Sequence, residues 1–235
     1  MATRTADRIQ PFTGFPGGGY DFFLELQAKQ SRDWFRTNKL RYEQLWEQPM
    51  RALIADLATR LRDVFPTIQP EGKIFRIYRD TRFSLDKSPF KTHIAAHILL
   101  SERAVQDWST PGFYLHFGLE DNVAALGRWM MSKEAVAIYR QAVAEERTGA
   151  PLQRLFEELE AADFHFEAHE ALKRVPPPFA QDHPRAGLLR LKGLAVSTPE
   201  IPEELLQSAD IASWISDQVH RAAPIVTWLQ ENVPV

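Results

Sequence analysis

An apolar stripe at helical spacing constrains the fold of this chain more than any other feature. Between residues 49 and 64, large hydrophobic residues recur at steps of three and four, the period at which one face of an α-helix repeats. Pro49 suits the first position of this helix, where a backbone N–H would have no helical partner. We therefore expect a helix whose apolar face packs on the core. The stripe consists of Met50, Leu53, Ile54, Leu57, Leu61 and Val64.

Shorter helices are expected before this stripe. Residues 1–19 form an irregular lead-in whose second half is rich in glycine and proline. Tyr20 to Gln27 has the pattern of a short helix, and Ser31 is a good N-cap for another that contains Trp34 and Phe35. The sequence therefore predicts a helical region over residues 20–65.

The hydrophobic period changes to that of β-strands over residues 73–131. Four segments there are rich in β-branched and aromatic residues, and the turn Glu120-Asp121-Asn122 suits a hairpin between the last two. Because strands that follow one another closely tend to pair, an antiparallel sheet is expected. The predicted strands are Lys73–Thr81, Thr92–Leu100, Gly112–Gly118 and Val123–Met131.

Residues 132–235 are expected to be mainly helical. Ser132 is a cap for one helix, and Pro151 suits the opening of a second. A further strand is expected at residues 188–196. The last helical region starts at Ala209, and Pro224 should kink or split it.

These elements predict an α+β fold with an antiparallel sheet of about four or more strands, packed with N-terminal and C-terminal helices. The chain has 235 residues, of which 44% are hydrophobic and 25% charged. A chain of this size buries enough surface to form a core without disulfides or metals. No linker interrupts it, so a single domain over residues 1–235 is expected.

The composition excludes several kinds of site. Cysteine is absent, which rules out disulfides, a cysteine nucleophile and a thiolate zinc site. Met1 to Asp7 has no apolar run of the kind a secretory signal needs, and no stretch approaches the length of a membrane span. We therefore expect a cytosolic protein with no membrane partner, no cofactor and no metal.

Positive charge gathers in one segment of an otherwise acidic chain. The net charge is −3, yet Lys73 to Lys91 contains six basic and two acidic residues. A local basic patch indicates a small anionic ligand, whereas a nucleic-acid backbone requires a broadly basic surface. If the segment is extended, Arg76, Tyr78 and Arg82 share one face with Asp80.

The guanidinium groups of this segment are suited to phosphate or carboxylate binding, with Asp80 or Asp86 as the orienting group or general base. The alternative is an internal network in which these two aspartates pair with the arginines and hold the loop. The predicted ligand-binding residues are Arg76, Tyr78, Arg79, Arg82, Ser84, Lys87, Lys91 and His116.

The same segment resembles the signature of a widespread family, a domain of unknown function with the pattern R-x-Y-R-D-x-R-F-S-x-D-K-x-P-[FY]-K. The resemblance continues at Trp34-Phe35, at Gly112 to His116 and at Asp182 to Arg185, so it covers most of the chain. The family carries asparagines just before the Trp-Phe pair, where this chain has Gln30-Ser31. The resemblance implies one fold and no particular reaction.

The histidines form a weaker set of candidates. His93 and His97 would share a strand face about 13 Å apart, which is too far for one metal ion. His97 and His116 are expected to be cross-strand neighbours, acting either as hydrogen-bonded sheet residues or as an acid, base or ligand. His165, Glu167 and His169 alternate, but extended geometry again argues against a joint metal site.

Three classes of function therefore stay open. The first is a protein that binds a small anionic ligand through the basic segment, with or without catalysis. The second is a protein-interaction module with an ionic surface. The third, nucleic-acid binding, is disfavoured by the acidic remainder of the chain.

Overall fold

The N-terminal helices of the computed structural model follow the predicted pattern. The structure describes residues 11–82, 85–100 and 110–234. Its first elements are α1 (Gly19–Lys29), α2 (Arg32–Tyr42), the π-helix η1 (Glu43–Glu47) and α3 (Gln48–Arg60). The Ser31 hydroxyl accepts a hydrogen bond from the backbone N–H of Trp34 at 3.4 Å, which confirms the predicted cap. Pro49, however, is the second residue of α3 and begins no separate helix, because η1 joins α2 to α3 without a break.

A six-stranded sheet forms the centre of the fold. Its strands are β1 (Lys73–Ile74), β2 (His93–Leu99), β3 (Gly112–Gly118), β4 (Asn122–Arg128), β5 (His165–Glu167) and β6 (Leu194–Ser197). Their order is β1-β2-β3-β4-β6-β5, and every neighbouring pair is antiparallel. The predicted α+β class and the hairpin between β3 and β4 are therefore confirmed.

The C-terminal helices differ from the prediction at two prolines. The elements are α4 (Lys133–Ala144), α5 (Glu146–Glu160), α6 (Ala186–Leu189), α7 (Glu203–Leu206) and α8 (Asp210–Asn232). Pro151 lies inside α5, which begins at Glu146, so the proline removes only the helical bond to the Arg147 carbonyl. In the turn before it, Trp228 Nε1 donates to the Thr148 carbonyl at 2.9 Å. Pro224 lies inside α8 and does not split it, since buried residues on both sides of the proline hold the helix on the core.

The strand predicted over residues 188–196 is only partly correct. Its first part is the short helix α6, and the strand β6 starts at Leu194. Side chains of α4 explain the difference: Tyr139 Oη donates to the Leu188 carbonyl at 3.0 Å, and Arg140 Nε to the Leu189 carbonyl at 2.9 Å. These bonds take up acceptors that a sheet ladder would need.

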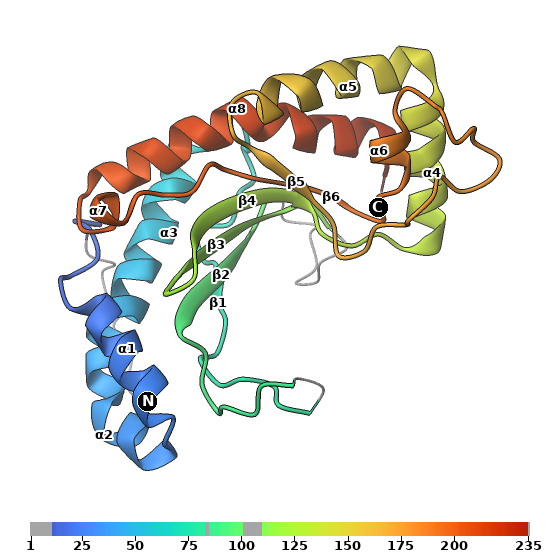
Figure 1. Cartoon of the computed structure of the whole chain (residues 1–235). Helices are drawn as coiled ribbons and strands as arrows, with labels where there is room; N and C mark the ends of the chain where they lie inside the picture. Colours follow the sequence, from blue (N-terminus) through green and yellow to red (C-terminus); the bar gives the residue numbers. More distant parts are fainter. Residues whose placement is uncertain (1–10, 83–84, 101–109, 235) are drawn as a thin grey trace, which may run out of the picture.

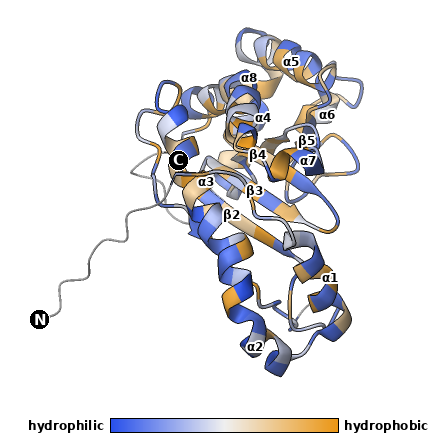
Figure 2. Ribbon diagram, turned by 90° about the vertical axis from the view of Figure 1, so that its left-hand side faces the viewer, coloured by the Kyte–Doolittle hydropathy of each residue, from blue (hydrophilic) through white to orange (hydrophobic). Residues whose placement is uncertain are grey.

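The helices and the sheet share one hydrophobic core on one face of the sheet. Figure 1 shows α3 and α8 along the outer side of the curved sheet, while the inner side of the curve faces away from them. Along the helices in Figure 2, hydrophobic and hydrophilic residues alternate at short intervals, as expected for helices with one buried face. The core-facing side chains of β2, β3 and β6 are Ile94, Ala96, Ile98, Phe113, Leu115, Phe117, Leu194 and Val196.

This core includes residues from both ends of the described chain, from Phe12 to Val233. Such continuity favours the single-domain assignment, which stays a prediction. In the part of the chain that the structure describes, no helix combines the length and the apolar character needed to cross a bilayer.

Candidate functional site

The basic segment leaves the sheet soon after β1. The predicted strand Lys73–Thr81 is wrong beyond Ile74, because the chain turns into an irregular hairpin of its own. In that hairpin the Arg79 N–H donates to the Pro89 carbonyl and the Lys91 N–H to the Ile77 carbonyl, both at 2.9 Å. Pro89 has no N–H to donate, so it cannot extend a regular ladder there. Exposed and less exposed side chains nevertheless alternate along residues 76–82, as expected for an extended chain.

Four residues of this hairpin are exposed in alternation with less exposed ones. Ile77 is buried and Arg79 is partly buried, whereas the four side chains predicted to share a face are all solvent-exposed. The exposed set is Arg76, Tyr78, Asp80 and Arg82.

A glutamine from the N-terminal helices holds the other arm of this hairpin. The Phe90 N–H donates to Gln30 Oε1 at 3.1 Å, and Gln30 Nε2 donates to the Phe90 carbonyl at 3.3 Å. Phe90 is fully buried and packs against Phe35, with ring centroids 4.7 Å apart. Ser31 therefore caps a helix, and Gln30 fixes the hairpin to it.

Two of the three arginines are engaged by the two aspartates of the segment. Arg79 Nη2 lies 3.1 Å from Asp86 Oδ2, and Arg82 contacts Asp80 through Nε at 3.0 Å and Nη2 at 2.7 Å. Hydrogen bonds from Arg82 hold the pKa of Asp80 well below its usual range. The pKa of Asp86 is lowered mainly by the backbone N–H of Ser88, which donates to it at 2.8 Å.

Arg76 lies in a hollow with two lysines and is not used by this network. Within the described part of the chain it makes no hydrogen bond or ion pair. The hollow has a volume of about 470 Å³; we call it the basic hollow, after Lys73, Arg76 and Lys91, and Phe75, Tyr78 and Asp80 also line it. Burial lowers the pKa of the half-buried Lys91, and the positive charges of Arg76 and Arg79 lower it further.

Two other predicted residues, Lys87 and His116, do not line the basic hollow. Lys87 Nζ donates to the Thr81 carbonyl at 2.8 Å, on the exposed tip of the hairpin. Ser84 lies outside the described residues. His116 lines a second cavity, on the open face of the sheet.

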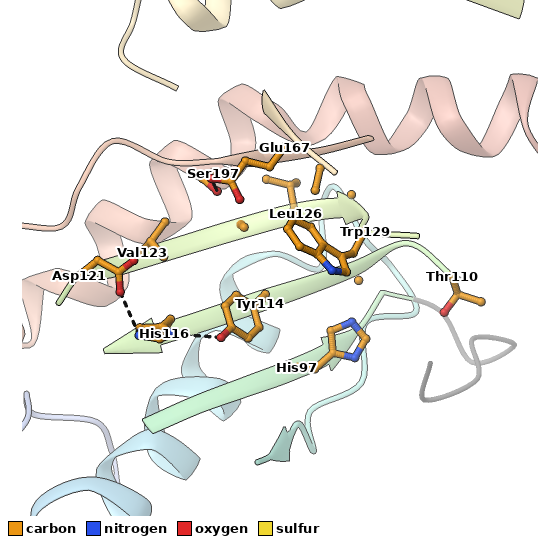
Figure 3. Close-up of a pocket in the computed structure, with 14 residues that line it drawn as sticks. His97, Thr110, Tyr114, His116, Asp121, Val123, Leu126, Trp129, Glu167 and Ser197 are labelled. Atoms are coloured by element: carbon orange, nitrogen blue, oxygen red, sulfur yellow. Dashed lines mark hydrogen bonds and ion pairs between the residues drawn. The ribbon is translucent and has the colours of Figure 1, made fainter. Parts of the chain in front are cut away.

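The open-face cavity has a volume of about 380 Å³; the sequence analysis named His97, His116 and Glu167 from its lining but did not predict the cavity. Figure 3 shows His97, Tyr114, His116, Trp129, Glu167 and Ser197 around it, on β2, β3, β5 and β6 and after β4. Because the lining residues are scattered along the chain, only the strand register brings them together. The one local signal was the period-two spacing of Tyr114 and His116.

The expected pairing of His97 with His116 is wrong. The register places His97 opposite Tyr114, and His116 opposite Ala95. His116 instead contacts His93, with ring centroids 4.1 Å apart. The register pairs the buried side chains of β2 and β3 on the core face, which leaves His97 and His116 diagonal to each other on the open face.

His93 should make the protein less stable in acid. Burial, the neighbouring His116 and the charges of Lys91 and Arg79 lower the pKa of His93 to about 3, against an ordinary value of 6.5. Between pH values of about 3 and 6.5, the unfolded chain therefore binds a proton at His93 that the folded chain does not bind. The free energy of unfolding should fall as the pH drops below about 6.5, with a limiting slope of about 1.4 kcal/mol per pH unit for this one group.

Urea denaturation of the wild type and of His93→Gln across this pH range tests the expectation. The glutamine variant should show a shallower loss of stability in acid. Equal slopes for the two proteins would contradict it.

The remaining histidines do not form a metal site in the described part of the chain. Glu167 lines the open-face cavity, while His165 and His169 are exposed. No group of three or more potential ligands to a metal ion is found among the described residues.

The chain was compared with curated proteins and with models of known protein families. No curated protein matches it. A model of the family described as conserved hypothetical protein (DUF2461) matches residues 19–228, which span every element from α1 to most of α8. The resemblance expected from the sequence is thereby confirmed at the level of the family. The chain belongs to the DUF2461 family of conserved hypothetical proteins.

Proposed function

We propose that the protein binds a small anionic ligand, through a phosphate or carboxylate group held in the basic hollow. The observation that carries this proposal is the position of Arg76. Its guanidinium lies in a hollow with Lys73 and Lys91, while Arg79 and Arg82 are paired with Asp86 and Asp80. A guanidinium fork matches the oxygens of phosphate and carboxylate in a bidentate arrangement.

Three cationic side chains and one carboxylate, that of Asp80, line the hollow, and this excess of positive charge supports the same role for Lys91. Its ammonium is half-buried, and its charged form is disfavoured by burial and by Arg76 and Arg79. An anion in the hollow would offset all of these effects, because it adds the opposite charge where positive charge is concentrated. Phe75 and Tyr78 add aromatic walls, so a ligand with an organic body beside its anionic group suits the hollow.

The two aspartates act in this proposal as orienting groups. Asp80 and Asp86 hold Arg82 and Arg79, and thereby fix the hairpin that presents Arg76. Carboxylates with a lowered pKa are weak proton acceptors, so a general-base role is the less favoured part of the original prediction.

The proposal is tested by the stability that an anion confers. Wild-type protein is melted with and without inorganic phosphate, sulfate or acetate, at constant ionic strength set with chloride. Phosphate should raise the melting temperature, since a ligand at one hundred times its dissociation constant stabilises the folded state by about 2.7 kcal/mol. Arg76→Lys should lose much of this effect, because the charge stays but the fork is lost.

The matched control is Arg82→Lys, a change of the same kind on the same hairpin. Because the Arg82 side chain does not line the basic hollow, this variant should keep the response to phosphate. Equal responses in both variants, or no response of the wild type to any anion, would contradict the proposal. A response to an oligonucleotide that exceeds the response to phosphate would favour nucleic-acid binding instead.

A further inference from the structure

Three side chains in the open-face cavity form a continuous hydrogen-bonded chain. Tyr114 and His116 are two residues apart on β3, so both point to the open face, and Asp121 follows in the hairpin to β4. The Tyr114 hydroxyl lies 3.0 Å from His116 Nδ1, and His116 Nε2 lies 3.0 Å from Asp121 Oδ1. Figure 3 shows the two contacts as dashed lines at the edge of the cavity.

The direction of these hydrogen bonds follows from their chemistry. An ionised carboxylate only accepts, so Nε2 of His116 carries the hydrogen and donates it to Asp121. In the neutral ring Nδ1 then holds the lone pair and accepts from the hydroxyl of Tyr114. Burial keeps the ring neutral by lowering the pKa of His116, and Lys91 adds to this, whereas Asp121 and Glu120 oppose it. Burial also raises the pKa of Tyr114 to about 12, so its hydroxyl keeps its proton.

The walls and floor of the cavity favour a flat, mainly apolar ligand. Trp129 and Tyr114 supply aromatic walls, and the strands expose small residues between them: Gly112, Ala125, Gly127 and Ala195. The His97 ring lies directly over Gly112, where any Cβ would collide with it. A sheet surface of small side chains bordered by aromatic rings accommodates a planar ring, and the volume is in the range of small-molecule sites.

We propose that this cavity binds a planar aromatic alcohol whose hydroxyl donates a hydrogen bond to the Tyr114 oxygen, with His116 and Asp121 as positioning residues. A hydroxyl oxygen has two acceptor lone pairs besides its own proton. Because His116 accepts the proton of Tyr114 in a hydrogen bond, the hydroxyl turns its lone pairs toward the cavity.

In the hydrogen-bonded chain, His116 is shielded from solvent, while Asp121 at the outer end reaches it. The His116 side chain is 15% exposed and that of Asp121 is 56% exposed. The other charged or titratable groups that influence His116 are His93 on β2, Lys91 before it, and Glu120 in the hairpin. Hydrogen bonds between such groups are stronger where water is excluded, which favours recognition of the ligand hydroxyl at Tyr114.

A pair of probes that differ only in the hydroxyl tests the site. The probe 4-nitrophenol has the O–H donor, and 4-nitroanisole replaces it with a methyl ether. Titration calorimetry should show that wild-type protein binds the phenol about tenfold more tightly, the effect of one well-formed hydrogen bond to a buried group. Tyr114→Phe should abolish this preference while binding both probes. Equal affinities in the wild type, retained preference in Tyr114→Phe, or binding of neither probe would overturn the proposal.

The positioning role of His116 and Asp121 needs a second readout, because a tyrosine hydroxyl without a partner would also accept a hydrogen bond. The preference for 4-nitrophenol over 4-nitroanisole is therefore measured in Asp121→Asn. It should be smaller than in the wild type, because the amide can donate to Nε2, and the ring then holds its hydrogen at Nδ1, facing the Tyr114 oxygen. An unchanged preference in Asp121→Asn would overturn the positioning role.

Two controls separate this site from the basic hollow and from unfolding. Arg76→Lys should leave both readouts unchanged, so failure here is distinguishable from failure of the anion proposal. The urea midpoint of Tyr114→Phe and Asp121→Asn, measured in parallel, confirms that each variant is folded when probed. A loss of both readouts in Arg76→Lys would place the probe in the basic hollow and overturn the proposal.

Discussion

Replacing Leu57 with alanine is expected to lower the free energy of unfolding by about 3 kcal/mol, within the range measured for buried leucines. Leu57 lies in the middle of α3 and is fully buried, as are Leu53 and Leu61 on the same stripe. The truncation leaves a cavity in a close-packed core, because the neighbouring helix and strands cannot move in to fill it. The urea denaturation midpoint, converted with the slope of the transition, measures the loss.

The control for this variant is Leu40→Ala in α2. Leu40 is 61% exposed, so its truncation should change stability by less than about 0.5 kcal/mol. A loss below about 1 kcal/mol for Leu57→Ala would mean that the stripe does not form the core.

The parts of the fold that were correctly predicted are those that local chemistry decides. The stripe on α3 repeats at the helical period, and its four central members Leu53, Ile54, Leu57 and Leu61 are all buried. Ser132 behaves as the predicted cap, since its hydroxyl accepts from the Ala135 N–H at 3.2 Å. Each of these signals lies within a few residues of the structure it produces, so one sequence suffices to recognise it.

The elements that were wrongly predicted depend on contacts between distant residues. Pro151 resembles a helix start, yet a bond from Trp228 helps to fix the turn that precedes it. Leu189 and Leu191 alternate with Arg190 and Lys192 as in a strand. Tyr139 and Arg140 nevertheless bond the carbonyls of residues 188 and 189 in a helical turn. No local pattern reports these partners, because they lie at least 49 positions away in the sequence.

The two candidate sites differ in the same way. The basic hollow was predictable in outline, because Arg76, Lys91 and the arginines between them lie in one short segment with an unusual charge. Which arginine is paired was not predictable, because it depends on how the hairpin folds. The open-face cavity requires the register of β2 with β3, and a shift by one residue would turn Tyr114 and His116 to the core.

The second large effect is expected at Arg185, which ties the loop before α6 to the end of α4. Its side chain is buried and donates from Nε to the Val143 carbonyl at 2.6 Å and from Nη2 to the Ala144 carbonyl at 2.9 Å. A third bond joins Nη1 to Glu146 Oε2 at 3.0 Å. The last carbonyls of a helix have no partner within it, so this arginine satisfies acceptors that would otherwise be buried unpaired.

Arg185→Met keeps much of the buried volume but removes every donor. It should lower the free energy of unfolding by about 3 kcal/mol, because the buried Val143 carbonyl and the partly buried Ala144 carbonyl lose their partner. Arg185→Lys should fall between this variant and the wild type, since one ammonium cannot reproduce the fork that spans two carbonyls. Urea denaturation of the wild type, Arg185→Lys and Arg185→Met measures the order of their free energies of unfolding.

Glu146→Gln separates the carbonyl contacts from the ion pair. The Glu146 side chain is 82% exposed, so water screens its attraction to Arg185 and the substitution should cost less than about 1 kcal/mol. If Arg185→Met cost no more than Glu146→Gln, the carbonyl bonds would contribute nothing beyond a surface pair. The expected gap between the two variants therefore measures how strongly a residue of the family-like Asp182–Arg185 segment holds the C-terminal helices together.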